Sequence, residues 1–294
     1  MRNRPFIAAL ALALLAPACG RKAAEAPKAE PPSIEALLDE TIAGAHRTPE
    51  ERARDQYRHP KETLLFFGLE RSSTVVEVWP GGGWYTNILA PAMKRGGGVY
   101  YAAGLDPDSS DRARDAVASF KEKFGADPEL YGPVNMTVLG EGHEIAPAGS
   151  ADLVLTFRNV HNWLAAGTAE GNFKLFYDAL KPGGVLGVTE HRAKTDASPE
   201  SERETGYVRE ATVRKLAEDA GFEFDSSSEI NANPKDAKDH PFGVWTLPPT
   251  RRSSAVRGVD DPNFDRAKYD AIGESDRMTL KFRKPLAADG ALLE

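Results

Sequence analysis

The stretch that decides the fold is Val75-Val76-Glu77-Val78-Trp79-Pro80-Gly81-Gly82-Gly83-Trp84-Tyr85-Thr86. Its first half is β-branched and apolar, which predicts a buried strand over residues 74–79. The helical pattern of residues 84–93 begins directly after the three glycines. Glycines at such a turn tolerate positive φ angles and let a ligand approach the backbone closely. Since the following helix also presents free N–H groups at its start, this turn is predicted to bind a ligand.

The spacing of the glycines excludes two phosphate-binding loops. A dinucleotide loop needs Gly-x-Gly-x-x-Gly, and counted from Gly81 the third place is Thr86. A P-loop needs Gly-Lys-Ser/Thr, which is absent. Instead the acid Glu77 precedes the turn, and a carboxylate there suits a cationic or hydroxyl-bearing ligand better than a pyrophosphate. The alternative is a tight turn without a ligand, whose N–H groups Glu77 caps.

Outward from this turn the chain alternates strands and helices. Further strands are predicted over residues 99–103, 135–139, 151–157, 185–190, 222–230 and 278–283, and helices over residues 34–45, 49–57, 61–67, 111–124, 172–180 and 204–220. Ser33 and Asp111 are the expected caps of two of these helices. Such alternation predicts an α/β fold, a doubly wound, mostly parallel sheet covered by helices on both faces. Residues 34–70 are predicted to form an N-terminal helical cap on a domain of residues 71–286.

The N-terminus has the features of an export signal. Arg2 and Arg4 precede an apolar run over residues 6–16, which is too short to span a bilayer. Small residues before Cys19 predict a signal peptide over residues 1–18 and a protein that is exported to the periplasm. Cys19 is the expected site of a lipid anchor, with plain secretion as the alternative. Residues 19–33 are predicted to be a flexible tether and residues 287–294 a C-terminal tail.

The amino-acid composition excludes several classes of protein and of site. The chain has 294 residues, of which 41% are hydrophobic and 28% charged, as in ordinary globular proteins. Its net charge of -7 argues against nucleic acid as a partner, because phosphate binding needs a basic face. With a single cysteine, the chain forms no internal disulfide and no cysteine-rich zinc site.

Four motifs resemble the class I S-adenosylmethionine-dependent methyltransferases. They are the cofactor loop at residues 75–83, Asp106 after the second strand, the fourth strand at residues 151–155, and the turn at residues 180–186. The stretch Glu-Val-Trp-Pro-Gly-Gly-Gly-Trp-Tyr-Thr further resembles a bacterial group of exported predicted methyltransferases. The resemblance implies a seven-stranded sheet of order 3-2-1-4-5-7-6 and S-adenosyl-L-methionine as cofactor. It implies methyl transfer to a small-molecule or envelope substrate.

The resemblance also assigns residues to the cofactor site. These are Glu77, Trp79, Gly81, Gly82, Gly83, Trp84, Tyr85, Asp106, Glu141, His143 and Arg158. Trp79 and Pro80 depart from the family pattern, because they stand where the first loop glycine is usual and the indole could crowd the cofactor. Asp108 rivals Asp106 as the ribose-binding acid. Trp84 and Tyr85 as core aromatics, and His143 as a surface residue, are the alternatives.

The candidate catalytic residues are Asn159 and His161. Asn159 follows the fourth strand, where residues border the sulfonium in the resembling fold. His161 is a candidate base or substrate contact, or else a solvated loop histidine. Glu190 and His191 form either a substrate site or an exposed strand end. Residues 57–59 form a lid or a simple turn, and residues 233–245 shape substrate access or merely connect strands.

Two competing functions remain open at this level. A catalytically degenerate methyltransferase fold could serve as an exported ligand-binding or scaffold lipoprotein, and export favours it because the cofactor is made in the cytoplasm. A metal site built from His143, His161, Glu190 and His191 is chemically reasonable, but its spacing is not specific and no metal is predicted.

Overall fold

A seven-stranded sheet forms the centre of the computed structural model, with the strand order β3-β2-β1-β4-β5-β8-β6. The strands are β1 (Thr74–Val78), β2 (Val99–Gly104), β3 (Asn135–Val138), β4 (Ala151–Phe157), β5 (Leu180–His191), β6 (Glu223–Ser228) and β8 (Arg277–Arg283). All neighbours pair in parallel except β8, which is antiparallel to both β5 and β6. The short strand β7 (Pro241–Val244) lies outside this sheet. The predicted fold and strand order are therefore confirmed, with β8 as the seventh strand of the sheet.

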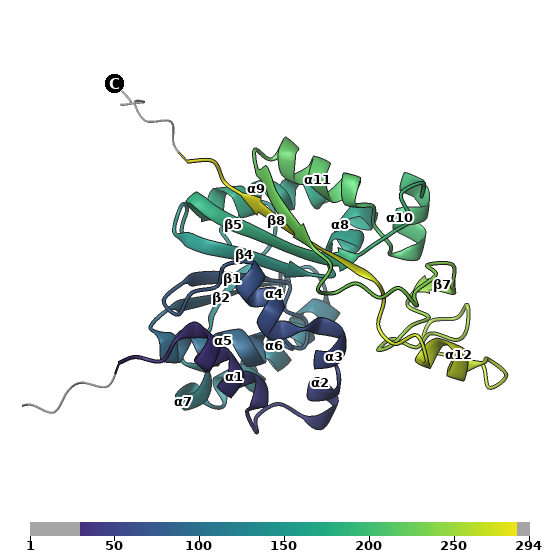
Figure 1. Ribbon diagram of the computed structural model, residues 1–294, viewed down its shortest axis with the longest axis horizontal. Coiled ribbons are helices and arrows are strands. Elements are labelled where there is room, and N and C mark those ends of the chain that lie inside the picture. Colours follow the sequence, from purple (N-terminus) through teal and green to yellow (C-terminus); the bar gives the residue numbers. More distant parts are fainter. Residues whose placement is uncertain (1–29, 287–294) are drawn as a thin grey trace, which may run out of the picture. The chain divides into compact units, whose positions relative to one another are not determined.

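Helices cover both faces of the sheet (Figure 1), with α1, α5 and α6 below it and α9 and α11 above it. The lower group is α1 (Ile34–Ala43), α4 (Pro60–Phe66), α5 (Thr86–Gly96), α6 (Asp111–Gly125) and α7 (Pro128–Tyr131), and the upper group is α8 (Val160–Ala166), α9 (Ala169–Ala179) and α11 (Glu210–Asp219). Val75 of β1 packs into the lower core, and its neighbours Val76 and Val78 pack into the upper one. Burial on both faces explains the nearly continuous apolar sequence of β1.

Four shorter helices complete the described part of the chain. They are α2 (Pro49–Ala53), α3 (Asp55–Arg58), α10 (Pro199–Thr205) and α12 (Arg266–Asp270). The structure describes residues 30–286, and none of its helices there is long and apolar enough to cross a membrane. The predicted signal peptide, Cys19, most of the tether and the C-terminal tail lie outside the described residues.

Local structure differs from the sequence prediction at several places, among them the unpredicted elements α7, α12 and β7. Ser110, not Asp111, caps α6, because its hydroxyl accepts a hydrogen bond from the backbone of Ala113. Residues 160–166 form the helix α8, which was not predicted. The helix predicted over residues 204–220 is broken, because Gly206 ends α10 in the left-handed conformation with φ at 74°. The predicted cap Ser33 is confirmed.

The three glycines after β1 differ in what they require. Gly83 has a φ of 78°, and a Cβ atom there would lie 2.2 Å from the ring of Phe124 on α6. Gly82 has no such φ, and a Cβ atom there would meet nothing within 4 Å. The side chain of Lys123, also on α6, donates to the Gly82 carbonyl at 3.0 Å. Close packing of α6 against the turn therefore demands glycine at position 83 but not at position 82.

Replacing Gly83 with alanine is expected to lower the free energy of unfolding by about 2–4 kcal/mol. Overpacking against Phe124 and a left-handed backbone each contribute about 1–3 kcal/mol. Gly82→Ala is the matched control and should change the free energy of unfolding by less than about 0.5 kcal/mol. Urea denaturation measures both variants, and equal stability of the two would contradict the packing argument.

Candidate functional site

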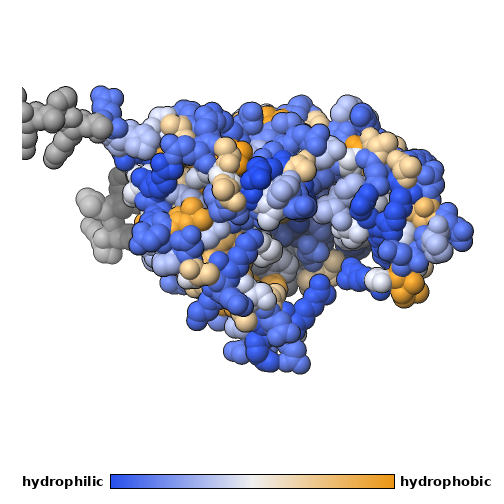
Figure 2. Space-filling model, turned by 90° about the horizontal axis from the view of Figure 1, so that it is seen from below, coloured by the Kyte–Doolittle hydropathy of each residue, from blue (hydrophilic) through white to orange (hydrophobic). Residues whose placement is uncertain are grey.

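The site lies where the strand order reverses, between β1 and β4. Ligands of doubly wound sheets bind at this point, beyond the carboxyl ends of the strands. Two cavities of about 190 and 290 Å³ meet there and share a wall of Trp79, Pro80, Gly81 and Asn159. Figure 2 shows a face that is hollowed near its centre and bordered mostly by hydrophilic residues.

Glu77 is the buried acid of the site. Its side chain comes from β1 and is 2% exposed, and its Oε2 accepts hydrogen bonds from the hydroxyls of Tyr100 at 2.6 Å and Thr86 at 2.9 Å. Burial raises the pKa of Glu77 to about 7, although these two hydrogen bonds act in the opposite direction. Its second oxygen, Oε1, accepts no hydrogen bond from the described residues, and the side chain lines the larger cavity. Glu77 therefore keeps one carboxylate oxygen for a ligand.

The backbone after Glu77 is shaped for close approach. Trp79 has a φ of 46°, a left-handed conformation that is costly for a residue with a side chain. Among the described residues the N–H groups of Gly81 and Gly82 find no backbone acceptor. The indole of Trp79 packs edge-on against Trp163 at 5.7 Å between centroids, so it turns toward the core while it lines both cavities. The cavities stay open beside it.

The smaller cavity is apolar, and we call it the apolar cavity. Its remaining lining comes largely from α6, β2 and β3 and includes Ala102, Leu105, Val117, Phe120 and Met136. A flat, largely apolar ring system is the kind of group that such a lining accepts.

Several predicted site residues lie outside both cavities. Asp106 accepts a hydrogen bond from the backbone of Asp108 at 2.9 Å, so its carboxylate closes a local turn. Glu141 and His143 are exposed, because the segment after β3 runs over the surface. Gly83 packs against α6 and lines neither cavity. The structure thus brings none of these four residues together with Glu77.

Asn159 and Arg158 follow β4 directly and face the turn. The side-chain amide of Asn159 donates to the carbonyl of Val78 at 3.0 Å and to the hydroxyl of Thr156 at 3.3 Å, which ties β4 to the end of β1. Arg158 has a φ of 63° and lines the larger cavity. Burial lowers the pKa of Arg158 to about 10, so it remains a cation at neutral pH.

The larger cavity is polar, and we call it the polar cavity. Three arginines line it, Arg54, Arg58 and Arg158, and we call them the arginine wall. Trp84 and Tyr85 line it too and are 8% and 4% exposed, so these aromatics belong both to the core and to the cavity. The guanidinium of Arg58 stacks 4.5 Å from the centre of the Trp84 ring.

A single buried carboxylate, Glu274, binds two arginines of this wall and also Arg277. Glu274 accepts from Arg54 at 2.6 Å, from Arg58 at 3.1 Å and from Arg277 at 2.7 Å. Burial alone would raise the pKa of Glu274, but the guanidinium groups of Arg277 and Arg58 lower it to about 2. This carboxylate stays ionised and joins the N-terminal helices to the start of β8.

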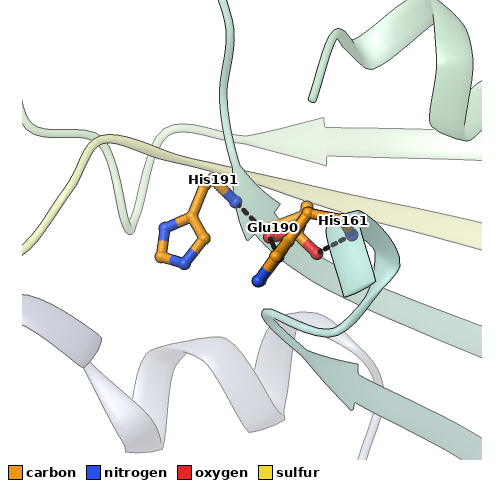
Figure 3. A group of neighbouring side chains, drawn as sticks. All are labelled: His161, Glu190 and His191. Carbon is orange, nitrogen blue, oxygen red and sulfur yellow. Dashed lines mark hydrogen bonds and ion pairs between the residues drawn. The ribbon is translucent and has the colours of Figure 1, made fainter. Parts of the chain in front are cut away.

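A second buried carboxylate, Glu190 at the end of β5, orients His161 of α8. Oε1 of Glu190 lies 3.0 Å from Nδ1 of His161, and both oxygens also accept backbone N–H groups of His161 and His191. Figure 3 shows the ring of His161 against Glu190, with its second nitrogen pointing away from the carboxylate. Since the carboxylate can only accept, Nδ1 carries a proton, and in the neutral ring Nε2 is the acceptor.

His191 lies beside this pair, with its ring centre 5.2 Å from that of His161. Burial, followed by the neighbouring His161 and Arg158, lowers the pKa of His191 well below its usual value, so its ring is neutral. Nitrogen and oxygen atoms of His161, Glu190 and His191 lie within 4.8 Å of one another, as a metal site would require. Nearby Arg58, Arg158 and Arg277 oppose a divalent cation there. The arrangement therefore fits an oriented imidazole better than a metal centre.

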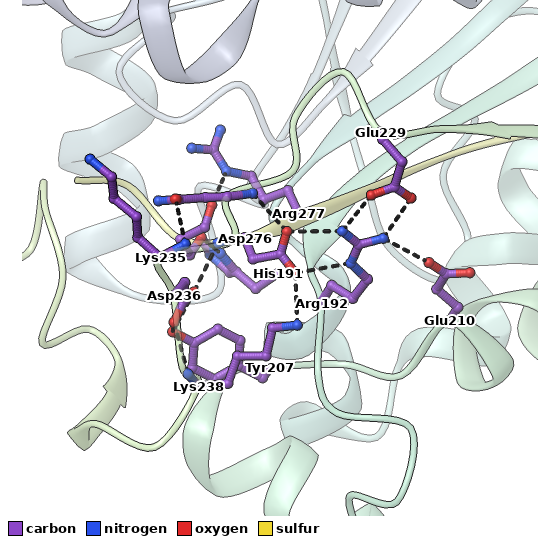
Figure 4. A network of polar contacts seen from close by, with 12 residues as sticks. His191, Arg192, Tyr207, Glu210, Glu229, Lys235, Asp236, Lys238, Asp276 and Arg277 are labelled. Carbon is purple, nitrogen blue, oxygen red and sulfur yellow. Dashed lines mark hydrogen bonds and ion pairs between the residues drawn. The ribbon is translucent and has the colours of Figure 1, made fainter. Parts of the chain in front are cut away.

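Polar contacts fix the long connection between β6 and β8, which carries Glu274. Arg192 pairs with Glu229 at 2.7 Å and with Asp276 at 2.9 Å, as Figure 4 shows. Buried Asp236 accepts from the hydroxyl of Tyr207 at 2.9 Å and from the backbone of Asp276 at 2.8 Å. Residues 233–245 are consequently an anchored segment rather than a solvated connection.

Comparison with solved structures identifies the fold. The [4+2]-cyclase SpnF matches with a TM-score of 0.54 and 16% identity over 83% of this chain and 86% of that protein. A candidate sarcosine dimethylglycine methyltransferase from Galdieria sulphuraria matches with a TM-score of 0.51 and 14% identity over 80% and 88%. The chain has the Rossmann-like methyltransferase fold. At these identities the likeness shows the architecture and not the reaction.

Other comparisons add little to this identification. A SAM-dependent methyltransferase from Aquifex aeolicus is 22% identical over 61% of this chain and 87% of that protein, with a TM-score of 0.47. Comparison with protein-family models finds no match, and comparison with curated proteins finds none either.

The most informative residues that sequence reasoning missed are Arg54, Glu274 and Arg277. They lie far from the glycine turn in sequence, and their pairing spans about 220 residues along the chain, as from Arg54 to Glu274 (|i−j|=220). Arg58 stood in a segment predicted to be a lid or a turn, and Glu190 in one predicted to be a substrate site or an exposed strand end. The high density of charged residues at positions 50–62 and 274–277 was the available signal.

Because burial raises its pKa to about 7, Glu77 stabilises the fold fully only below about pH 4.5, and that contribution is lost as pH rises through 7. Compared with the wild type, Glu77→Gln should gain about 3 kcal/mol in free energy of unfolding between pH 4.5 and pH 8, because glutamine has no charge to bury. Urea denaturation at both pH values measures this difference. The exposed Glu122→Gln is the control, and a pH-independent difference for Glu77→Gln would refute the raised pKa.

Proposed function

We propose that this protein is an S-adenosyl-L-methionine-dependent methyltransferase. The observation that carries the proposal is Glu77, a buried carboxylate with one oxygen directed at a ligand cavity beside a glycine turn. Its position at the switch point of a methyltransferase fold supports the same assignment.

The donor set of the site fits this cofactor. Glu77 would hold a cationic or hydroxyl-bearing part of it, and the free N–H groups of Gly81 and Gly82 would meet a polar edge. The apolar cavity beside Trp79 would take the adenine ring. When bound, the cofactor supplies a methyl group on a positively charged sulfur. Trp79 and Asn159 stand on the wall between the two cavities, so the polar cavity would take both the part of the cofactor that meets Glu77 and the acceptor.

We assign the general base to His161. Glu190 holds Nδ1–H, so Nε2 accepts a proton from the nucleophile as the methyl group is transferred. Neighbouring His191 is neutral and hydrogen-bonds to Ser275, so it does not compete for Glu190 through its ring. Glu190 acts through His161 and is a positioning residue.

The fold leaves the reaction open, because one of the structural relatives named above is a [4+2]-cyclase. A degenerate fold that binds a ligand without methyl transfer is therefore the second outcome of the tests below. We also propose that the protein acts outside the cytoplasm as a lipoprotein, which rests on the sequence of residues 1–19 alone.

Calorimetric titration with S-adenosylmethionine and S-adenosylhomocysteine tests the cofactor assignment. Affinity for the cationic S-adenosylmethionine should rise about tenfold per pH unit up to pH 7 and level off above it, because Glu77 must ionise. Glu77→Gln should weaken binding at pH 8 by about 1–3 kcal/mol and abolish the pH dependence. The exposed Glu141→Gln is the matched control. Failure of the wild type to bind either compound would refute the proposal.

Transfer of a labelled methyl group to components of an envelope extract tests the catalytic assignment. His161→Ala should slow transfer by about 10²–10⁴-fold without loss of cofactor binding, because the base is removed. Glu190→Gln should shift the pH profile of the rate as well as lower it. His143→Ala, an exposed histidine, should leave the rate unchanged. Cofactor binding without transfer to any component would favour the degenerate fold.

A further inference from the structure

The arginine wall has hydrogen-bond donors that no described residue accepts. Arg54, Arg58 and Arg277 share the one carboxylate of Glu274. Arg158 has no hydrogen bond or ion pair through its guanidinium to any described residue, and the carboxylates whose charges act on it are those of Glu274 and Glu190. Glu51 and Glu77 line the same cavity, but among the described residues neither side chain pairs with an arginine of the wall. Guanidinium donors of the wall are therefore left without an acceptor beside the polar cavity.

Two of these arginines also keep unused donors. Nη2 of Arg54 and Nη2 of Arg58 are buried and have no hydrogen-bond partner among the described residues. The side chain of Arg58 is only 3% exposed, and both arginines line the polar cavity. A buried N–H group without an acceptor is costly, and a buried charge without compensation more so. Ion pairs with Glu274 explain how these side chains are held but not why their outer donors are left without partners.

Backbone strain at two positions points the same way. Arg158 adopts a φ of 63°, and His59, next to Arg58, adopts a φ of 37°. Left-handed backbone at residues other than glycine is uncommon and clusters at ligand sites. At both positions it turns the chain where an arginine enters the cavity wall.

We propose that the arginine wall binds an anionic group, a carboxylate or phosphate, on the methyl acceptor. This inference rests on the proposed function. Planar guanidinium groups match both oxyanions through paired N–H donors. The cofactor does not satisfy the wall, because it carries one carboxylate against an ammonium and a sulfonium and so adds a net positive charge. An acceptor with one or two negative charges gives the unpaired donors of Arg54 and Arg58 and the unpaired guanidinium of Arg158 a partner in the polar cavity.

The experiment titrates inorganic phosphate, and separately malonate, into the full chain saturated with S-adenosylhomocysteine. We expect binding of at least one anion in the millimolar range or tighter. Arg158→Gln should weaken it tenfold or more while affinity for S-adenosylhomocysteine changes less than threefold. Arg158 has no ion pair within the described residues to lose, so this variant is expected to fold, and thermal unfolding checks it. Arg54→Gln is the second variant, and Arg112→Gln, exposed on α6, is the matched control.

Each other outcome overturns the inference in a distinct way. If S-adenosylhomocysteine binds but neither phosphate nor malonate does, the proposed acceptor site is refuted and the proposed function still stands. Equal weakening by Arg112→Gln shows adventitious surface binding. A matching loss of affinity for S-adenosylhomocysteine in Arg158→Gln shows that the wall holds the cofactor. Anion binding to a chain that binds no S-adenosylhomocysteine fails the proposed function itself and assigns the wall to a different activity.

Discussion

The site depends on keeping a carboxylate almost wholly buried at the end of β1. Glu77 is 2% exposed, and the hydroxyls of Tyr100 and Thr86 compensate one of its oxygens. Tyr100 comes from the neighbouring strand β2 and Thr86 from the first turn of α5, so the acid joins three elements of the fold. Desolvation raises its pKa, and a ligand that brings positive charge stabilises the ionised form. Burial thus gives Glu77 a preference for cationic ligands that an exposed acid lacks.

On the other side of the turn, the electrostatics are reversed. Glu274 gathers arginines from α3, from the residue that precedes it and from β8, and the arginine wall stands in front of it. A buried carboxylate shared by three guanidinium groups satisfies its own lone pairs while leaving the arginines under-compensated. Glu77 and the arginine wall therefore present opposite charges to the same polar cavity, and Trp79 and Asn159 stand between this cavity and the apolar one.

The functional residues near the glycine turn could be predicted from the sequence, but the roles of residues far from the turn could not. Glu77 was recognised because the strand, the acid and the glycines are adjacent in the chain. Asn159 was predicted to contact the ligand, and the structure also shows its amide holding the carbonyl of Val78. Gly83 was assigned to the cofactor, whereas Phe124 is its nearest neighbour. Local patterns show which residue types are present, but they do not show what packs against them.

The sequence by itself determined the alternation of strands and helices, the class of fold and the acid beside the glycine turn, because each follows from short-range periodicity and turn chemistry. Only the tertiary structure decided that His161 is oriented by Glu190, that Glu274 gathers arginines from both ends of the described chain, and that His143 is apart from them. These contacts join residues tens to hundreds of positions apart. Their energies come from burial and from pairing across the sheet, neither of which leaves a periodic trace in the sequence.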